Sequence, residues 1–360
     1  PRFNVPNTLA NPYLTGGTRS EFEVGTEVSF LNNRLGFDLT YYDRVDEDLP
    51  ISIPVPGSTG YSGLSINSGA SSTSGVELTL NATPIQSEDF RWDVSFNIAS
   101  IKKVTDKLYD GINSRVLDYM SWYSLQLQER VGEEWGTFVG RAPRTDDNGT
   151  PIYSASGRTQ YEGNQVLGNI LPDYTGGFST SFAYKNWNLD AGFDFQSGGL
   201  FSSTSNMFAY YSGMHMDTIG LNDKGNPKRD AVSAGGGVHV VGVTSGGDTV
   251  DVYQSASTHF YTNYFGNHPN WLYDASYVKL RTLRIGYDFP KSMLENTNFS
   301  DINISVIGNN LLLLYSNIPE GGLDPSEIEG SGSLASSYRS QEGGQLPPAR
   351  TIGLNLSLKF

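Results

Sequence analysis

The last ten residues, Thr351 to Phe360, alternate between polar and apolar side chains without interruption. Successive side chains of a β-strand point to opposite faces, so this segment predicts a strand with one apolar and one polar face. About ten residues is also the length that a tilted strand needs to cross the hydrocarbon layer of a membrane. A strand of a soluble β-sandwich can carry the same pattern, so the rest of the chain has to separate the two.

The composition favours a β-rich chain and excludes several classes of protein. Among 360 residues there are 41 Gly, 21 Tyr and 18 Phe, and only 17% of the residues are charged. The 24 basic and 38 acidic residues give a net charge of −14, so no nucleic-acid partner is expected, because phosphate binding requires an excess of Lys and Arg. The chain has no Cys, which excludes disulfides and thiolate metal sites. No stretch approaches eighteen apolar residues, so a membrane-spanning helix is not expected.

The alternating pattern returns along the whole chain and predicts about nine long strands. It slips out of phase twice. Val278 and Leu280 are out of step with Leu283, and Leu311 and Leu313 are out of step with Val306. Each slip predicts a β-bulge or a change at the end of a strand.

The links between the predicted strands alternate between short and long. The long links cover about 50–70, 105–173, 199–273 and 316–348. A sandwich has no reason to place every long loop at one end, whereas an outer-membrane barrel has short periplasmic turns and long outer loops. The pattern therefore predicts an all-β fold, a transmembrane antiparallel up-and-down β-barrel. An open sheet of nine strands would leave two unsatisfied edges in lipid, so the chain is expected to be part of a longer barrel or to pair with another chain.

Several motifs follow one another in order along this framework. They include Asn33-Arg34-Leu35, Tyr41-Tyr42-Asp43-Arg44 and Ser74-Gly75-Val76-Glu77-Leu78. The most specific block is Tyr277-Val278-Lys279-Leu280-Arg281, which Gly308-Asn309-Asn310-Leu311 and Asp324-Pro325 follow. With these motifs the chain resembles the SusC/RagA-like family of TonB-dependent outer-membrane transporters. The loop 199–273 matches no pattern of the family, and Ser74 stands where the family usually has Asn.

The resemblance implies a fold and a function. A member of the family is a plugged barrel of about 22 strands, of which residues 1–360 would form the carboxy-terminal nine. The plug domain and the TonB box are not in this sequence. The implied function is TonB-dependent import of oligomeric nutrients, glycans or peptides, across the outer membrane of a Gram-negative bacterium. The implied partners are TonB, a SusD-like surface lipoprotein and outer-membrane lipid, and no cofactor is implied.

The polarity of the strands and their order add expectations about orientation. Apolar side chains of the last strand should face lipid, and polar side chains should face the lumen, among them Asp93, Asn97, Asp190, Asp194 and Asn355. The carboxy terminus is expected in the periplasm and the long loops outside the cell. The terminal aromatic residue, Phe360, is expected to serve as the signal for insertion, as in other barrels that end on an aromatic residue.

No pattern in the sequence indicates an enzyme or a metal site. The four histidines, at 215, 239, 259 and 268, do not stand at metal-ligand spacing. Asp146-Asp147-Asn148-Gly149 lacks the ligands of a calcium loop and is better explained as a turn. There is no nucleophile elbow and no recognisable catalytic set.

Aromatic residues in the long loops are the candidate contacts for a ligand or a lid protein. Flat rings can stack on sugar faces or on peptide side chains, and the competing explanation is that they pack the loops together. The candidates are Trp122, Tyr123, Trp135, Tyr210, Tyr211 and Trp271.

Two other functions stay open at the level of sequence. The barrel could be a scaffold within a larger outer-membrane assembly that imports nothing. The chain could also be a soluble, secreted all-β binding protein. A TonB box upstream would favour import, and a requirement for detergent would exclude the soluble protein.

Overall fold

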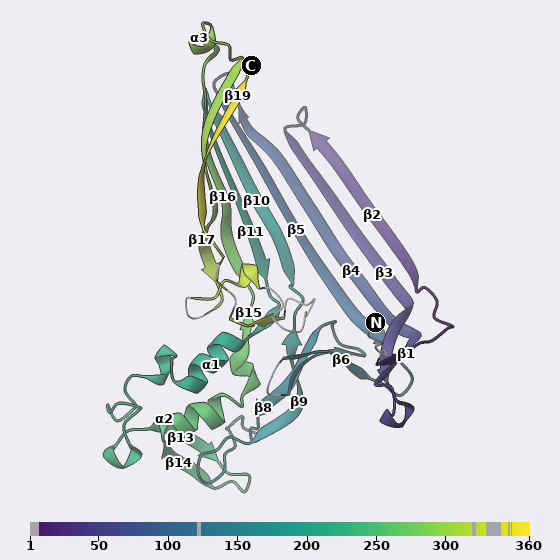
Figure 1. The fold of residues 1–360 in the computed structure, drawn as a ribbon, viewed down its shortest axis with the longest axis vertical. Coiled ribbons are helices and arrows are strands. Elements are labelled where there is room, and N and C mark those ends of the chain that lie inside the picture. The colour runs from purple at the N-terminus through teal and green to yellow at the C-terminus, as the bar shows by residue number, and fades with distance from the viewer. Residues whose placement is uncertain (1–6, 121–123, 319–321, 329–339, 345, 347) are drawn as a thin grey trace, which may run out of the picture.

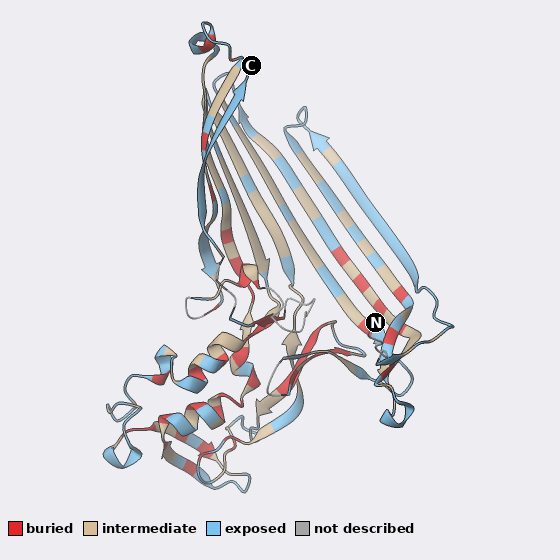
Figure 2. Ribbon diagram, in the orientation of Figure 1, coloured by how far each residue is buried: buried red, intermediate tan, exposed pale blue. Residues whose placement is uncertain are grey.

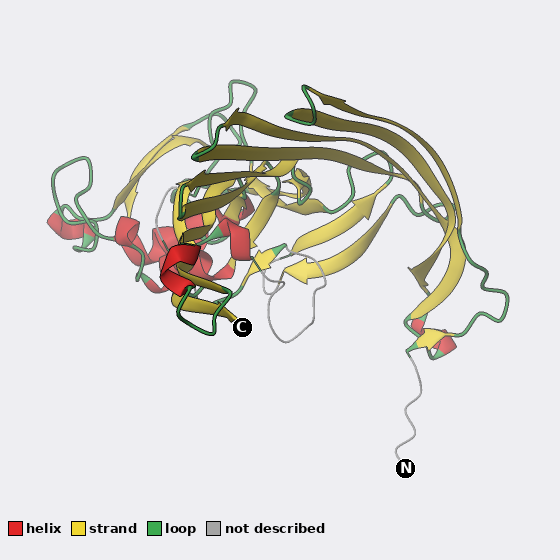
Figure 3. Ribbon diagram, turned by 90° about the horizontal axis from the view of Figure 1, so that it is seen from above, coloured by secondary structure: helices red, strands yellow, loops and turns green. Residues whose placement is uncertain are grey.

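The computed structural model describes residues 7–120, 124–318, 322–328, 340–344, 346 and 348–360. Its main element is a ten-stranded sheet that curves into an open arc (Figure 1 and Figure 3). Nine long strands are antiparallel to their neighbours, and the short β1 (Thr8–Leu9) pairs parallel with β4. The nine, in chain order, are β2 (Thr18–Phe30), β3 (Leu35–Pro54), β4 (Gly63–Gln86), β5 (Phe90–Lys107), β10 (Tyr174–Tyr184), β11 (Trp187–Ser197), β16 (Tyr277–Asp288), β17 (Asp301–Ser316) and β19 (Thr351–Lys359).

The two faces of this sheet differ in polarity because the alternating patterns of neighbouring strands are in register. Phe37, Leu80, Phe96, Phe178 and Phe193 stand opposite one another on five successive strands. An adjacent row on the other face holds only small polar residues and glycine. That row is Asn81, Ser95, Ser179, Gly192 and Thr282.

Both predicted phase slips are confirmed as irregularities of the sheet. The register between β11 and β16 shifts between Gly192 and Phe193, so that Arg281 has no partner in the ladder. The register between β16 and β17 shifts again near this point, and Asn310 has a positive φ of 54°. An extra residue on one strand changes the face to which later side chains point, which explains the change of phase.

The link between β3 and β4 is shorter than the expected loop 50–70. Pairing continues as far as Pro54 opposite Gly63, which leaves only residues 55–62 between the strands. Ile51 stands opposite Ile66, and Ile53 opposite Leu64, so apolar cross-strand pairs extend the hairpin.

The other three long links fold into a structured region at one end of the sheet, which we call the loop module (Figure 1). It comprises the described residues of 108–173, 198–276 and 317–350. The opposite end of the sheet carries the short turns and the carboxy terminus (Figure 1). The strands of the module are β6 (Ser114–Met120), β7 (Leu125–Arg130), β8 (Thr137–Pro143), β9 (Tyr161–Asn169), β12 (Leu200–Ser203), β13 (Val238–Val243), β14 (Thr249–Gln254), β15 (Leu272–Asp274) and β18 (Gln341–Glu342), and its main helices are α1 (Thr204–Ser212), α2 (Ala256–Thr258) and the π-helix η4 (His259–Tyr264). Outside the module, the short helix α3 (Lys291–Leu294) lies in the β16–β17 link.

Burial is concentrated in the loop module rather than in the curved sheet (Figure 2). Leu127 and Phe138 are fully buried between β7 and β8, and Phe201 is 1% exposed on β12. In contrast, many apolar side chains on the sheet are exposed, such as Leu354 at 72% and Phe22 at 63%. A long exposed apolar face is unusual for a protein in water, and it is the face that lipid would cover in a membrane.

Candidate functional site

The polar face of the sheet carries paired charges. Asp190 on β11 lies 3.1 Å from Arg284 on β16, and Asp194 lies 2.8 Å from Arg281. Asp93 on β5 pairs with Arg91 at 2.6 Å. Each pair is partly exposed on this face, where it is screened by solvent. The charges therefore determine the polarity of the surface more than its stability.

A hollow of about 410 Å³ lies on the same face between Asp93 and Asp190. Its wall includes the row of small polar side chains, together with Thr83 and Ser181. Thr83 donates a hydrogen bond to Asp93 at 2.7 Å, and Ser181 donates one to Asp190 at 2.6 Å. A surface of hydroxyl, amide and carboxylate groups can bind polar, hydroxyl-rich molecules, and in a barrel it would line the lumen.

A buried lysine ties the last long loop to the polar face. Lys279 on β16 has a side chain only 2% exposed, and its Nζ lies 2.7 Å from Asp324 and 3.0 Å from the hydroxyl of Ser326. Glu327 is 3.6 Å from the same ammonium group. Asp324 caps the short helix η6 (Pro325–Glu327) by accepting a hydrogen bond from the backbone of Ser326. The loop is thus held by a charged group that has lost most of its water.

Arg281 extends this contact into the sheet. It is the residue left out of the ladder by the bulge, and its guanidinium donates to Asp194 and to Asn310 at 2.8 and 3.0 Å. It also pairs with Glu327. Burial raises the pKa of Asp324, but hydrogen bonds from Lys279 and Ser326 outweigh it and leave the pKa below its ordinary value. We call Lys279, Arg281, Asp194, Asp324 and Glu327 the loop-anchoring network.

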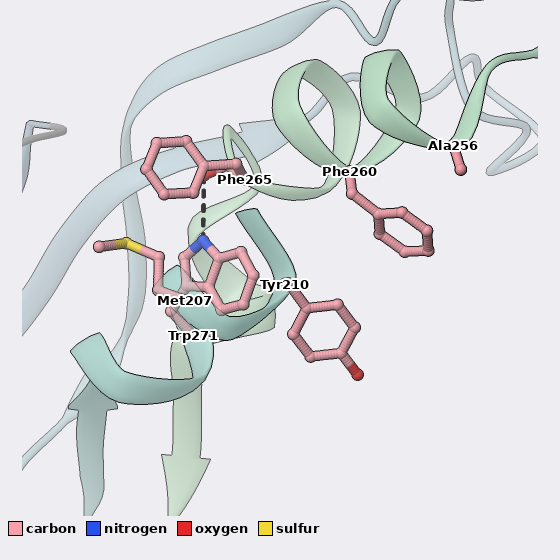
Figure 4. Close-up of a cluster of buried hydrophobic side chains, with 6 residues drawn as sticks. All are labelled: Met207, Tyr210, Ala256, Phe260, Phe265 and Trp271. Carbon is pink, nitrogen blue, oxygen red and sulfur yellow. Dashed lines mark hydrogen bonds between the residues drawn. The ribbon is translucent and has the colours of Figure 1, made fainter. Parts of the chain in front are cut away.

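Two of the predicted aromatic contacts lie in the core of the loop module. Trp271 is 2% exposed, and its indole donates a hydrogen bond to the carbonyl of Phe265 at 3.0 Å (Figure 4). Tyr210 is 5% exposed and stacks on Tyr264 with ring centroids 4.2 Å apart. Both candidate contacts are buried rather than exposed, because α1 and residues 256–271 build a hydrophobic core of their own. Trp271 offers no open face to a ligand, whereas Tyr210 borders a cavity beside the end of α1.

The remaining predicted residues are placed differently. Tyr211 is 42% exposed and packs one side against Phe265. Trp135 is half-buried, with the Lys103 ammonium 5.1 Å from its ring centroid. Phe360 is 85% exposed, and its ring centroid lies 5.0 Å from that of Phe299. Trp122 and Tyr123 lie outside the described residues. A role of these rings in ligand binding, and of Phe360 in insertion, stays a prediction.

The histidines belong to the loop module, and within the described ranges no group of three His, Cys, Asp or Glu side chains could hold a metal ion. His239 lies between Asp251 and Asp223, at 2.7 and 2.6 Å, and stacks on Tyr253. The hydrogen bond to Asp251, reinforced by Asp223, raises the pKa of His239. None of the helices in the described part of the chain is both long and apolar enough to span a membrane.

His259 gives the loop module a pH-dependent stability. Burial, reinforced by the nearby charge of Lys228, lowers its pKa from 6.5 to about 4. The unfolded segment therefore binds a proton near pH 6.5, whereas the folded one does not until about pH 4. Stability is complete above pH 6.5 and falls as the pH drops through this window, by about 3 kcal/mol in total.

We expect hydrogen exchange of residues 256–271, corrected for its intrinsic pH dependence, to show this loss between pH 7 and pH 4.5. The variant His259→Phe should remove most of it, because Nδ1 of His259 has no hydrogen-bond partner in the described structure. His239→Gln is the matched control, because the raised pKa of His239 acts with the opposite sign. A pH dependence that persists in His259→Phe would contradict this assignment.

No family model matches the chain. It is nevertheless similar along nearly its whole length to curated receptors. It is 25% identical over 379 residues to TonB-dependent receptor P3 of Formosa agariphila, covering 99% of this chain and 35% of the receptor. It is 25% identical over 380 residues to TonB-dependent receptor SusC of Bacteroides thetaiotaomicron, covering 97% of this chain and 32% of SusC. The chain thus spans about a third of the length of the curated relatives that it matches.

Solved structures agree with the fold. The RagAB peptide importer in its open-open state aligns with a TM-score of 0.68 and 21% identity, over 98% of this chain and 36% of that one. Its closed-closed state aligns with a TM-score of 0.67 and 20% identity, over 97% of this chain and 36% of that one. The predicted all-β barrel fold and the predicted resemblance to SusC/RagA-like TonB-dependent transporters are both confirmed.

Proposed function

We propose that this chain is the carboxy-terminal wall of an outer-membrane importer, in which a preceding plug is moved by TonB. The observation that carries the proposal is the similarity to TonB-dependent receptors over nearly the whole chain. The sheet supports it, because one face is apolar and exposed while the other is polar and hollowed. An importer needs this division, with lipid on one side and a wet passage on the other.

The substrate that this wall supports is a polar oligomer, a glycan or a peptide. The hollow of about 410 Å³ offers hydroxyls, amides and carboxylates rather than a deep apolar pocket. Such groups form many weak hydrogen bonds, which suit a molecule that must enter and leave. The RagAB importer, a similar structure, is described as a peptide transporter.

The experiment that tests import uses the full-length protein with and without its TonB box. Cells that depend on this protein are given fluorescent oligosaccharide and peptide mixtures, and uptake into the periplasm is measured. We expect uptake of at least one mixture to require the TonB box. Uptake of neither mixture, with the barrel folded in the outer membrane, would favour the scaffold.

We also propose that the loop module lies outside the cell, with the short turns in the periplasm. The support is that the folded long links share one end of the sheet (Figure 1). Residues 1–360 contain no Cys, so this part of the protein adds no background to single cysteines placed as reporters. Asp147→Cys in the module should react with an impermeant thiol reagent on intact cells. Glu88→Cys in the β4–β5 turn should react only after the outer membrane is opened, and the reverse result would overturn the topology.

A surface lipoprotein of the SusD kind is the partner that we propose for the loop module. The module exposes Met214, Met216 and Leu221, at 83%, 73% and 63%. The three residues stand close together in the sequence, and contiguous exposed apolar patches often mark protein interfaces. A lipoprotein should therefore co-purify with the full-length protein and be lost when these three residues are changed to Ser. If the lipoprotein still co-purified with that variant, this surface would not be part of the interface.

A further inference from the structure

A second cavity, separate from the hollow of the sheet, lies inside the loop module. It has a volume of about 320 Å³ and opens between the end of α1 and the start of α2. Tyr210, Tyr211 and Phe260 form its apolar wall. In Figure 4, Tyr210, Phe260 and Ala256 belong to the same hydrophobic cluster as Trp271, and the rings of Tyr210 and Trp271 have centroids 5.7 Å apart. The apolar wall of the cavity is therefore part of the core of the loop module.

Arg229 is the single cation among the residues that line this cavity. Its Nε donates to the carbonyl of Thr218 at 3.2 Å, and its Nη2 donates to the hydroxyl of Thr218 at 2.7 Å and to the carbonyl of Gly213. These bonds fix the guanidinium plane but use only neutral acceptors. In the described part of the chain, no carboxylate lies within 4.0 Å of Arg229, and Nη1 donates no hydrogen bond.

Hydroxyl groups also line the cavity. Ser255 and Ser257 line the cavity, and their hydroxyl oxygens are 3.2 Å apart. Tyr211 presents an exposed ring. A fixed guanidinium without a carboxylate attracts an anion, hydroxyls can hydrogen-bond to it, and a ring packs on a flat apolar surface.

We propose that this cavity is a binding site for a carboxylate that a ligand carries on or next to a ring. The carboxylate pairs with Arg229 and accepts a hydrogen bond from the hydroxyl of Ser257, while the ring packs on Tyr211. The chemistry is shared by an acidic sugar and by a peptide that ends in an aromatic residue. The identification of this ligand as part of the imported nutrient rests on the proposed function, whereas the binding itself does not.

Two matched pairs of small probes test the site on the full-length protein in detergent by isothermal titration calorimetry. One pair is p-nitrophenyl glucuronide and p-nitrophenyl glucoside, and the other is N-acetylphenylalanine and its amide. Within each pair only the carboxylate differs. We expect the acidic member of at least one pair to bind about tenfold more tightly than the neutral one, because a hydrogen-bonded charge is involved. The pair that shows the preference distinguishes a sugar source from a peptide source.

Variants connect the preference to the cavity. Arg229→Gln should abolish it, Arg229→Lys should keep part of it, and Tyr211→Ala should weaken both members of the pair. Lys228→Gln is the matched control, because it removes a neighbouring positive charge that does not line the cavity. Since Arg229 also supports the end of α1, Ser257→Ala provides a test that leaves this support intact, and it should reduce the preference.

Two results would overturn the site: no binding of any probe into the millimolar range, or an unchanged preference in both Arg229→Gln and Ser257→Ala. These outcomes are separate from those of the import experiment. A protein that binds the acidic probes but imports nothing would refute the importer and retain the site. A protein that imports without any preference would refute the site alone.

Discussion

Replacing Lys279 with methionine is expected to lower the free energy of unfolding of the barrel by about 3–5 kcal/mol. Lys279 is 2% exposed at its side chain and balances Asp324, 2.7 Å away. Methionine fills a similar volume but leaves the carboxylate of Asp324 without its ammonium partner, whereas Glu327 keeps its ion pair with Arg281. Urea unfolding of the full-length protein measures the global effect, and hydrogen exchange of residues 322–328 measures release of the loop.

A double-mutant cycle separates the lost pair from lost packing. Asp324→Leu alone leaves the buried Lys279 with only the more distant Glu327, 3.6 Å away, as a counter-charge, so it should also be strongly destabilising. The double variant should recover much of the loss, because no buried charge remains at the contact. Lys107→Met is the matched control, since Lys107 is 3.9 Å from an exposed Asp110 and such pairs contribute about 0–1 kcal/mol. Additive losses in the double variant would argue against direct coupling.

The strands could be predicted from the sequence because one physical rule governs them. In a sheet with one polar and one apolar face, polar and apolar residues alternate along each strand. A β-bulge is the common way to change the phase of this alternation. The out-of-step pairs near Leu280 and Leu311 therefore indicated the irregularities that the structure places around Arg281 and Asn310. Ile51 and Ile53 also follow the period of two, and the hairpin continues through them into a segment expected to be loop.

Contacts between distant segments could not be predicted in this way. Lys279 and Asp324 each belong to a motif that the sequence singles out, but nothing in either motif indicates that they meet across 45 residues. Trp271 illustrates a second limit. Aromatic residues in a long loop suggest exposure only if the loop lacks a core of its own, and here Met207, Phe260 and Phe265 supply one. Arg229 belongs to no recognisable motif, so the cavity that it lines could not be predicted from the sequence.

The last strand gives the second large expected effect, because its two faces should meet different solvents. Leu356 stands opposite Ile304 on the apolar face and is 59% exposed, whereas Ser357 stands opposite Asn303 on the polar face. If the apolar face meets lipid, Leu356→Arg near the membrane midplane should destabilise the folded barrel by about 2–4 kcal/mol. Ser357→Arg is the control on the adjacent residue, and it should have much less effect because a wet face solvates the guanidinium.

Folding of the two full-length variants into liposomes, followed by guanidinium titration, measures the difference. Adjacent substitutions share the same strand, depth and added charge, so only the face distinguishes them. In a soluble barrel or sandwich, an Arg on the buried apolar face would also lower stability. In such a protein, however, other parts of the protein would have to cover that face. In the described residues Leu354, Leu356 and Leu358 are instead 40% exposed or more. Equal stability of Leu356→Arg and Ser357→Arg would therefore contradict contact with lipid on this face.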